Sequence, residues 1–561
     1  MHKIKINGIL TGNQAHIAEE FNKYFASIGK KLNDDLPPSS IDPLSYLTGD
    51  YLNSMNVMQA SEFDIISIIK TLPNKKATMD QISVEIIKEN AELLAPALKT
   101  LFNKSIDTGI FPHAFKHATV IPIYKNGSHA EINNYRPISL LNIFSKIFEK
   151  LIKKTLVSFL NTNHIISNCQ FRFQSGLSTF DAHNELSTFL YKNLDKGDKV
   201  LALFIDFRKA FDTVPHDILL KKLYHYGIRG SILKWFQSYL TGRTQSTRFG
   251  EHTSSNTPIS VGLPQGSVLG PILFNIYIND LSNISEILKC ILFCDDSTLY
   301  LKEKNINTLI EKANIELHKL YAWVIANRLT INTDKTVAIV FSTRKILNVP
   351  LLFIKNGTSY DVIKRVSTTK FLGVHYDEHL NFKHHISFLS GKLSKLAGMI
   401  FSIKDYLPRH ILKVIYNAHV NSVLSYNTPI WCCNYKNNIK PIELLQKKII
   451  RNITKSDYLE HTKPLFKQSK ILTVVDMNRL YMGSQYKKFP VKYVNPLRRS
   501  HQQNTRHYHS LLPIQHSLRL VGNSFRVQGP KNYNSIPLNI RSCRTIYGFK
   551  RNYKKFLLSQ N

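Results

Sequence analysis

Two apolar runs that each lead into aspartate constrain this chain more than any other feature. Lys199–Ile205 has the length and continuous apolar character of a buried strand, and Asp206 follows it directly. Residues 291–293 and 298–302 flank Cys294-Asp295-Asp296-Ser297, a pattern that predicts a strand, a tight turn and a second strand. Only tertiary folding could bring these two sites together, because they are far apart in the sequence.

Convergence of Asp206, Asp295 and Asp296 at strand ends would form a hard oxygen site suited to Mg²⁺. Two such ions about 4 Å apart can activate an attacking oxygen and stabilise a leaving one in phosphoryl transfer. Aspartate is also common in turns for purely local reasons. When the two sites are considered alone, an ordinary turn without a metal therefore remains the alternative interpretation.

The net charge indicates a polyanionic partner. The chain has 561 residues, with 74 Lys+Arg against 39 Asp+Glu, a formal charge of +35 and a sequence pI of about 9.8. Nucleic acid is the expected partner, since solubility alone rarely needs so large a charge of one sign. A hydrophobic content of 43% excludes wholesale disorder, and the length favours several domains.

Secretion and membrane insertion are not indicated. No run of about 18 apolar residues is apparent, and the start MHKIKINGIL lacks the apolar region of a signal peptide. The six cysteines show no metal-type spacing, and Cys432 and Cys433 are adjacent. We interpret them as reduced thiols of an intracellular protein.

Positive charge is concentrated toward the C-terminus. Residues 435–561 contain 25 Lys+Arg and 4 Asp+Glu, and no acidic residue follows Asp476. Aromatic residues lie among these cations, a mixture that suits RNA or single strands because cations follow phosphates and rings stack on bases. The alternative is that the rings build a small core and the charges face solvent.

Hydrophobic periodicity predicts both helices and strands. Helices are expected over residues 15–28, 85–108, 215–226, 231–240 and 306–326, and further strands over 118–124, 337–342, 351–354 and 371–376. From His385 onward the pattern is mainly helical and then irregular and basic.

Five segments, in family order, resemble reverse transcriptases. FIDFRKAFDTV at 204–214 is similar to motif A, VGLPQGSVLGP at 261–271 to motif B and FCDD at 293–296 to motif C. NYRPISLL at 134–141 resembles the fingers motif, and FLGV at 371–374 resembles the primer grip. The runs FDTVPHDILL and GLPQGSVLGPILFNIYINDL resemble the non-LTR, jockey-like group of retrotransposons, and the resemblance covers almost the whole chain.

The resemblance implies an α+β right hand with fingers, a palm on an antiparallel sheet and a helical thumb. We expect an N-terminal helical extension at 1–110, fingers and palm at 111–384, a thumb at 385–434 and the basic nucleic-acid-binding region at 435–561. The implied activity is RNA-directed DNA polymerisation with two Mg²⁺ ions, Mn²⁺ being possible. RNA template, DNA primer or target and dNTPs are the expected partners, without a membrane, in the nucleus or cytoplasm. The oligomeric state is left open.

The resemblance also assigns catalytic roles. Asp206 and Asp295 would bind both metals, with Asp296 supporting the turn and as a third candidate ligand. The backbone carbonyl of Phe207 would be a further ligand. Lys335 matches the motif D lysine, an acid proposed to protonate the leaving pyrophosphate.

Nucleotide and primer contacts follow in the same way. Arg136 would contact the triphosphate, with Lys125 as a second cation for which a solvated surface role is equally expected. Phe211 would be a steric gate against a 2′-OH or, alternatively, simple core packing. Gln265 and Gly266 would lie against the nascent base pair, since glycine permits close approach. The primer grip would consist of Phe371, Leu372, Gly373 and Val374.

Several departures from the family pattern leave other functions open. Where the family often has QFGFRPGRST, this chain has QFRFQSGLST, with Arg172 for glycine, Gln174 for arginine, Ser175 for proline and Leu177 for arginine. Cys294 replaces the more usual alanine. The N-terminal endonuclease of full-length elements is not recognisable, so we expect polymerisation without nicking. An inactive nucleic-acid-binding remnant is one alternative, and an RNA-dependent RNA polymerase is a less favoured one.

Overall fold

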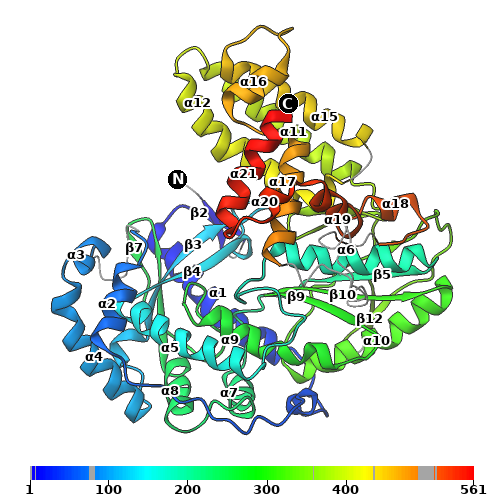
Figure 1. Ribbon diagram of the computed structural model, residues 1–561. Coiled ribbons are helices and arrows are strands. Elements are labelled where there is room, and N and C mark those ends of the chain that lie inside the picture. Colours follow the sequence, from blue (N-terminus) through cyan, green and yellow to red (C-terminus); the bar gives the residue numbers. More distant parts are fainter. Residues whose placement is uncertain are drawn as a thin grey trace.

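The computed structural model combines two five-stranded sheets with a large helical region, all three visible in Figure 1. It describes residues 3–560 except 7, 75–81, 358, 434–435, 490–510 and 512–513. This mixture of helices and sheets agrees with the α+β class expected from the sequence. All six cysteines are free thiols.

The first large sheet has the strand order β4-β3-β6-β7, with β8 paired to β6. Strand β3 (His117–Tyr124) pairs antiparallel with β4 (Tyr135–Leu141) and parallel with β6 (Arg243–Phe249). Helix α1 (Gln14–Asp34) packs against β6, β7 (His252–Thr253) and β8 (Thr257–Ile259). Helix α1 buries Ile17 and Phe21, the face that its apolar periodicity predicts.

Further helices pack together beside this sheet, and their bounds are α2 Glu62–Lys70, α3 Val84–Glu89, α4 Ala91–Thr108, α5 Ile143–Thr162, α7 His216–His225, α8 Gly230–Leu240 and α9 Gly270–Tyr277. The helical stretch predicted over 85–108 is confirmed, although the chain forms two helices, α3 and α4, with a break at Asn90. The Asn90 side-chain amide donates to the Ile86 carbonyl at 2.9 Å and ends α3. A short two-stranded sheet of β1 (Ile4–Ile6) and β2 (Ile9–Thr11) lies near the N-terminus.

The second large sheet carries the aspartates and has the order β14-β11-β5-β10-β9. Its strands are β5 Lys199–Ile205, β9 Lys289–Phe293, β10 Asp296–Glu303, β11 Val337–Phe341 and β14 Lys364–Arg365. All neighbours are antiparallel except β11 and β14. The strands expected from the two apolar runs are therefore confirmed, with ends that differ by one or two residues in β9 and β10.

Helices cover both faces of this sheet. Leu201 and Leu203 of β5 face the core shared with α10 (Ile306–Ala326), whereas Val200 and Ala202 face the core shared with α6 (Thr179–Asp195). Because side chains alternate along a strand, a strand buried on both faces is apolar at nearly every position. This explains the continuous apolar run that precedes Asp206.

Two hairpins follow α10. Strands β12 (Phe353–Asn356) and β13 (Ser359–Val362) form one, and β15 (Thr368–Phe371) and β16 (Val374–Asp377) form the other. The single strand expected over 371–376 is wrong, because the chain turns at Leu372 and Gly373, whose φ angles are +38° and +90°. The hairpin expected for the primer-grip segment is confirmed.

The helical region lies above both sheets in Figure 1. Its helices are α11 Lys383–Ile403, α12 Arg409–Ile415, α13 Ser422–Ser425, α14 Thr428–Trp431, α15 Lys436–Thr454, α16 Thr462–Ser469, α17 Val474–Lys488, α18 Arg519–Gly522, α19 Phe525–Ser535, α20 Leu538–Arg541 and α21 Ile546–Gln560. The irregular C-terminus expected from the sequence is wrong for 514–560, where helices predominate.

One hydrophobic core runs from the aspartate-bearing sheet through α11 and α15 to α19. The predicted boundary at residues 434–435 lies outside the described residues, and helices on its two sides share this core. Of the described helices, α11 is the one long and apolar enough for a membrane span, which by itself is weak evidence. Helix α11 packs along α15 and buries Leu389, Leu393 and Ile400.

Candidate functional site

The tight turn between β9 and β10 presents two adjacent carboxylates. Asp296 pairs with Phe293 across the hairpin, so Cys294 and Asp295 form a two-residue turn. Cys294 adopts a φ of +63°, a left-handed conformation that a two-residue hairpin requires at its centre. The turn exposes Asp295 and Asp296 and buries the Cys294 side chain.

Antiparallel pairing of β5 with β10 brings Asp206 to the same edge. Ser297 lies opposite Ile205, the last residue of β5, and this register places the following residue, Asp206, beside Asp296. The Asn332 side chain donates to Asp206 Oδ2 at 2.8 Å, and the Asn332 backbone N–H donates to the Asp206 carbonyl at 2.7 Å. The sheet register therefore brings Asp206 close to the turn that carries Asp295 and Asp296, and Asn332 orients the Asp206 carboxylate.

The three carboxylates repel one another. Partial burial, followed by the charges of Asp295 and Asp206, raises the pKa of Asp296 to about 6. Arg172 and Lys125 act in the opposite direction on the same carboxyl. A site that holds three carboxylates at one edge favours a bound cation, because a cation offsets their mutual repulsion.

The donor set fits Mg²⁺ by its chemistry. Carboxylate oxygens are the ligands that Mg²⁺ prefers, and it commonly uses one or two of them together with water and substrate phosphates. Within the described ranges, no group of three or more His, Cys, Asp or Glu side chains is arranged so that it could hold a metal ion by itself. Asp206, Asp295 and Asp296 thus form an open edge rather than a protein cage.

Besides Arg172, the cations Lys125, Arg136, Lys209 and Lys335 gather around this edge. Burial and the nearby charges of Arg136 and Lys335 lower the pKa of Lys125, whereas Asp206 and Asp295 raise it. Burial lowers the pKa of Lys209 as well, with Lys125, Lys335 and Arg136 adding to the decrease. Arg136 lies on β4, opposite Ile123 of β3. The arrangement concentrates positive charge beside the carboxylates, as a triphosphate would require.

Lys209 was missed in the sequence analysis. It follows Asp206 by three residues and has a φ of +49°, a conformation uncommon for a residue with a side chain. Its ammonium group lies 5.4 Å from the centre of the Tyr24 ring. The sequence signal that could have identified Lys209 is its position between Asp206 and Phe211 in the motif A segment.

Motifs A and B are bound to each other by hydrogen bonds. Gln265 Nε2 donates to Asp212 Oδ1 at 2.8 Å, and the Leu263 N–H donates to the Phe211 carbonyl at 2.7 Å. Burial raises the pKa of Asp212 to about 6, and the bond from Gln265 partly offsets this increase. Asp212 is a second residue that sequence reasoning missed, and it orients the Gln265 amide.

The motif B loop also lies against strand β4. The Ser139 N–H donates to the Gln265 carbonyl at 2.8 Å, and Gly266 has a φ of +131°. A Cβ at Gly266 would lie 2.5 Å from the Ser139 carbonyl oxygen. The glycine is therefore required by a close approach to the backbone of β4 as well as by its own conformation.

Phe211 is partly buried and stacks on a second ring. Its centroid lies 4.6 Å from that of Phe274, with an interplanar angle of 24°. Phe207, next to Asp206, is 6% exposed, and its backbone pairs with Ile331. The stacking supports the packing interpretation of Phe211 and also holds the ring rigidly in the motif A segment.

Two side chains from different helical segments contact the turn of the β15–β16 hairpin. Tyr426 Oη donates to the Leu372 carbonyl at 2.7 Å, and His183 Nε2 of α6 lies 3.3 Å from the same oxygen. His183 Nδ1 also contacts Tyr376 Oη at 3.1 Å. Phe371 and Val374 are buried below the turn. The hairpin is thus tied both to the aspartate-bearing sheet and to the helical region.

The altered 170–179 segment lies beside the carboxylates. The Arg172 guanidinium is 4.9 Å from the Phe293 ring centre and 4.8 Å from that of Phe173. Gln174 Nε2 donates to the Ser167 carbonyl at 3.4 Å, and Leu177 packs against the core. The segment therefore keeps one cation at the site, at the position where the family often has glycine.

The C-terminal aromatic residues mostly build the core. Tyr486 and Phe525 are buried, and Tyr481 and Tyr533 pack partly buried against the same cluster. Tyr481 and Phe525 both contact the Phe180 ring of α6. The alternative interpretation, in which these rings build a core, therefore holds for the four rings named here. Tyr493 and Tyr508 lie outside the described residues.

Comparison with known proteins gives a consistent family. Residues 123–376 match the family described as reverse transcriptase (RNA-dependent DNA polymerase). The probable RNA-directed DNA polymerase from transposon BS of Drosophila melanogaster is 27% identical over 481 residues, 82% of this chain and 51% of that protein.

Two further relatives are similar over much of the chain. The RNA-directed DNA polymerase from mobile element jockey of Drosophila melanogaster is 26% identical over 76% of this chain and 47% of that protein. The Pol polyprotein from type-1 retrotransposable element R1 of Bradysia coprophila is 25% identical over 76% of this chain and 42% of that protein. The chain spans about half the length of the curated relatives it matches.

Proposed function

We propose that the chain is an RNA-directed DNA polymerase, because residues 123–376 match the reverse transcriptase family and the similar proteins include the polymerase of the mobile element jockey. It extends a primer 3′-OH with dNTPs on an RNA template. The observation that carries the proposal is the convergence of Asp206, Asp295 and Asp296 at one sheet edge, with Lys125, Arg136, Lys209 and Lys335 around it.

Asp206 and Asp295 hold the divalent ions, with Asp296 beside them and the Phe207 carbonyl as a further oxygen ligand. When bound, two Mg²⁺ ions supply Lewis-acid activation of the primer hydroxyl and charge stabilisation at the α-phosphate. Asn332 keeps the Asp206 carboxylate oriented through its 2.8 Å hydrogen bond. A fixed ligand lowers the reorganisation needed when the ions and substrate arrive.

The cations bind the triphosphate. Arg136 can bind two phosphate oxygens at once through its planar guanidinium, and Lys125 and Lys209 add point charges. Lys335 lies in the loop after Asn332, where its ammonium can protonate the leaving pyrophosphate. Charge on the departing oxygen is thereby relieved.

Sugar and base are positioned by motifs A and B. The Phe211 ring, held by its stack on Phe274, lies below the sugar and excludes a 2′-OH. Gln265 and Gly266 lie against the nascent base pair, with the Gln265 amide oriented by Asp212. The primer 3′ end rests on the turn formed by residues 371–374.

The expected partners are an RNA template, a DNA primer or target, and dNTPs. We place the reaction in the nucleus or cytoplasm, where these partners occur together. The basic C-terminal region, with no acidic residue after Asp476, binds the nucleic acid outside the active site.

The test is extension of a DNA primer on an RNA template with Mg²⁺ and dNTPs, comparing wild type with Asp295→Asn. Asparagine keeps the size of the side chain and removes the charge that holds the metal. Activity should fall by several orders of magnitude, because metal-assisted catalysis supplies several kcal/mol. Asp107→Asn on the exposed face of α4 is the matched control and should extend normally.

Each alternative predicts a different outcome. An inactive remnant would bind the primer–template without any extension by wild type. An RNA-dependent RNA polymerase would prefer rNTPs to dNTPs on the same template. Near-normal extension by Asp295→Asn would refute the assignment of the metal site.

A further inference from the structure

A large cavity lies between α15, α16 and α17, outside the site described above. Its volume is about 1580 Å³, larger than the pockets that hold drug-sized molecules. We call it the basic cleft because its lining includes six cations against two carboxylates, Glu443 and Asp476. The cations are Lys447, Lys448, Arg451, Lys463, Arg479 and Arg519.

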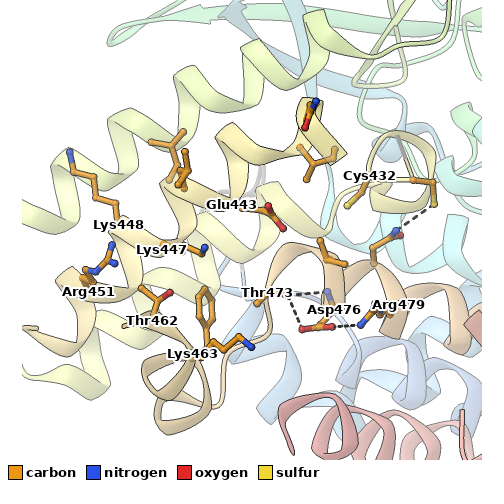
Figure 2. Close-up of a pocket in the computed structure, with 18 of the residues that line it drawn as sticks. Cys432, Glu443, Lys447, Lys448, Arg451, Thr462, Lys463, Thr473, Asp476 and Arg479 are labelled. Atoms are coloured by element: carbon orange, nitrogen blue, oxygen red, sulfur yellow. Dashed lines mark hydrogen bonds and ion pairs between the residues drawn. The ribbon is translucent and has the colours of Figure 1, made fainter. Parts of the chain in front are cut away.

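Three of these six cations form neither an ion pair nor a hydrogen bond among the described residues. Lys447, Lys448 and Lys463 are exposed, and none of them forms an ion pair or hydrogen bond with the part of the chain that the structure describes. Figure 2 shows Lys447 and Lys448 on α15 and Lys463 on α16. Unpaired ammonium groups in the lining of one cavity create a positive potential that favours a bound anion.

The two carboxylates do not cancel this potential. Asp476 is buried, caps α17 through Thr473 and pairs with Arg479 at 3.2 Å. Glu443 is the one remaining carboxylate of the lining. The cleft therefore keeps a net positive charge after the internal pair is formed.

An exposed aromatic ring lies in the same lining. Tyr458 is 78% exposed, and the Arg451 guanidinium lies 5.8 Å from its ring centre. Leu459, the next residue, is 89% exposed. An exposed ring beside unpaired cations is the combination with which proteins bind single strands, because the ring stacks on a base while the cations follow the backbone.

We propose that the basic cleft binds a single-stranded segment of nucleic acid. The backbone phosphates lie along Lys447, Lys448 and Lys463, and one base stacks on Tyr458. The basic cleft is separate from the carboxylate edge. The proposal rests on the proposed function only for the origin of the strand, which would belong to the template or the target. A cavity of this size and charge fits a flexible polyanion better than a compact metabolite.

The decisive variant is the triple substitution Lys447→Gln, Lys448→Gln and Lys463→Gln in the full chain. The probe is a labelled 20-nucleotide oligo(U) strand, titrated across a salt series with a saturating primer–template duplex present to occupy the carboxylate edge. Three lost phosphate contacts at about 0.7 each should lower the slope of log affinity against log salt by about 2. The matched control replaces the same three lysines by arginine and should keep the wild-type slope.

A second pair of variants tests the ring. Tyr458→Ala should weaken oligo(U) binding about 5- to 150-fold, since base stacking on an aromatic side chain contributes about 1–3 kcal/mol. Tyr458→Phe keeps the ring and should bind like wild type. Because the four residues are on the surface, unfolding does not obscure the result.

Three outcomes would overturn the proposal, and a fourth would support it for DNA as well as RNA. An unchanged salt slope in the triple glutamine variant would show that the three lysines do not contact the bound strand. Equal competition by a polyglutamate peptide would identify a general acidic-protein surface instead, and equal competition by inorganic phosphate would identify a small-anion site. Oligo(dT) binding as strong as that of oligo(U) would assign the site to either nucleic acid and leave it intact. Extension on a short template should be normal in the triple, so failure of the cleft and failure of the polymerase assignment are distinguishable.

Discussion

Replacing Tyr426 by phenylalanine tests whether the β15–β16 turn is held in place from the helical region. The substitution removes one hydroxyl, which donates to the Leu372 carbonyl at 2.7 Å, and keeps the ring. The ring itself touches the turn, because a Cβ at Gly373 would lie 2.9 Å from Tyr426 Cε1. The variant therefore isolates the hydrogen bond from the packing.

The expected magnitude follows from the exposure of the pair. A neutral hydrogen bond contributes about 0.5–1.5 kcal/mol, and the lower part of this range applies because Tyr426 is 41% exposed and water can replace its hydroxyl. His183 remains within 3.3 Å of the same carbonyl. A loss of about 0.5–1 kcal/mol should lower kcat/KM for primer extension about 2- to 5-fold.

The assay is single-nucleotide extension at varied primer–template concentration, together with the urea midpoint of unfolding. Tyr406→Phe is the matched control, since Tyr406 is 84% exposed and should extend and unfold like wild type. Identical kcat/KM for Tyr426→Phe and wild type would refute the idea that this bond positions the turn.

Gly373→Ala provides an independent measure of the same turn. Alanine at a φ of +90° should lower the free energy of unfolding by about 1–2 kcal/mol, and the contact with the Tyr426 ring adds to this loss. In a Tyr426→Ala background only the conformational part should remain. Simple additivity of the two substitutions would show that the predicted steric contact does not exist.

Phe211→Val should allow incorporation of rNTPs while changing dNTP incorporation less. Loss of the stacked ring should also lower the free energy of unfolding by about 1–3 kcal/mol. Unchanged discrimination against rNTPs would show that Phe211 serves only in packing. Asp212 has a native pKa of about 6, above the ordinary 3.8. Its ionised form therefore lowers the free energy of unfolding above pH 6, and this loss of stability disappears as the pH falls toward 4. The gain in urea midpoint from pH 7 to pH 5 should accordingly shrink in Asp212→Asn. Gln174→Arg should lengthen products at a given salt concentration, whereas Leu177→Arg should lower the melting temperature because Leu177 packs against the core. A chain that ends at Asp476 loses most of α17 and should melt early or be proteolysed, and cooperative wild-type-like melting would contradict the shared core.

Local sequence determined the elements around the carboxylates. The length of β5, the hairpin at 293–296 and helix α10 over Ile306–Ala326 all follow from apolar periodicity and turn residues. These features depend on hydrogen bonds and burial between residues close in the chain, which is why pattern alone suffices. The pattern failed at Asn90 and at the Leu372–Gly373 turn, where a single side-chain bond or a positive φ interrupts an otherwise regular run.

The tertiary structure alone decided which groups meet. The register of β10 on β5 places Asp296 beside Asp206, and no local signal specifies that register. The same holds for Lys209 among the cations beside the carboxylates and for Tyr426 at the Leu372 carbonyl, since their partners come from other parts of the chain. Sequence thus determined the carboxylates and the strands that carry them, whereas long-range pairing and packing determined their neighbours, because contacts between distant residues depend on the whole fold.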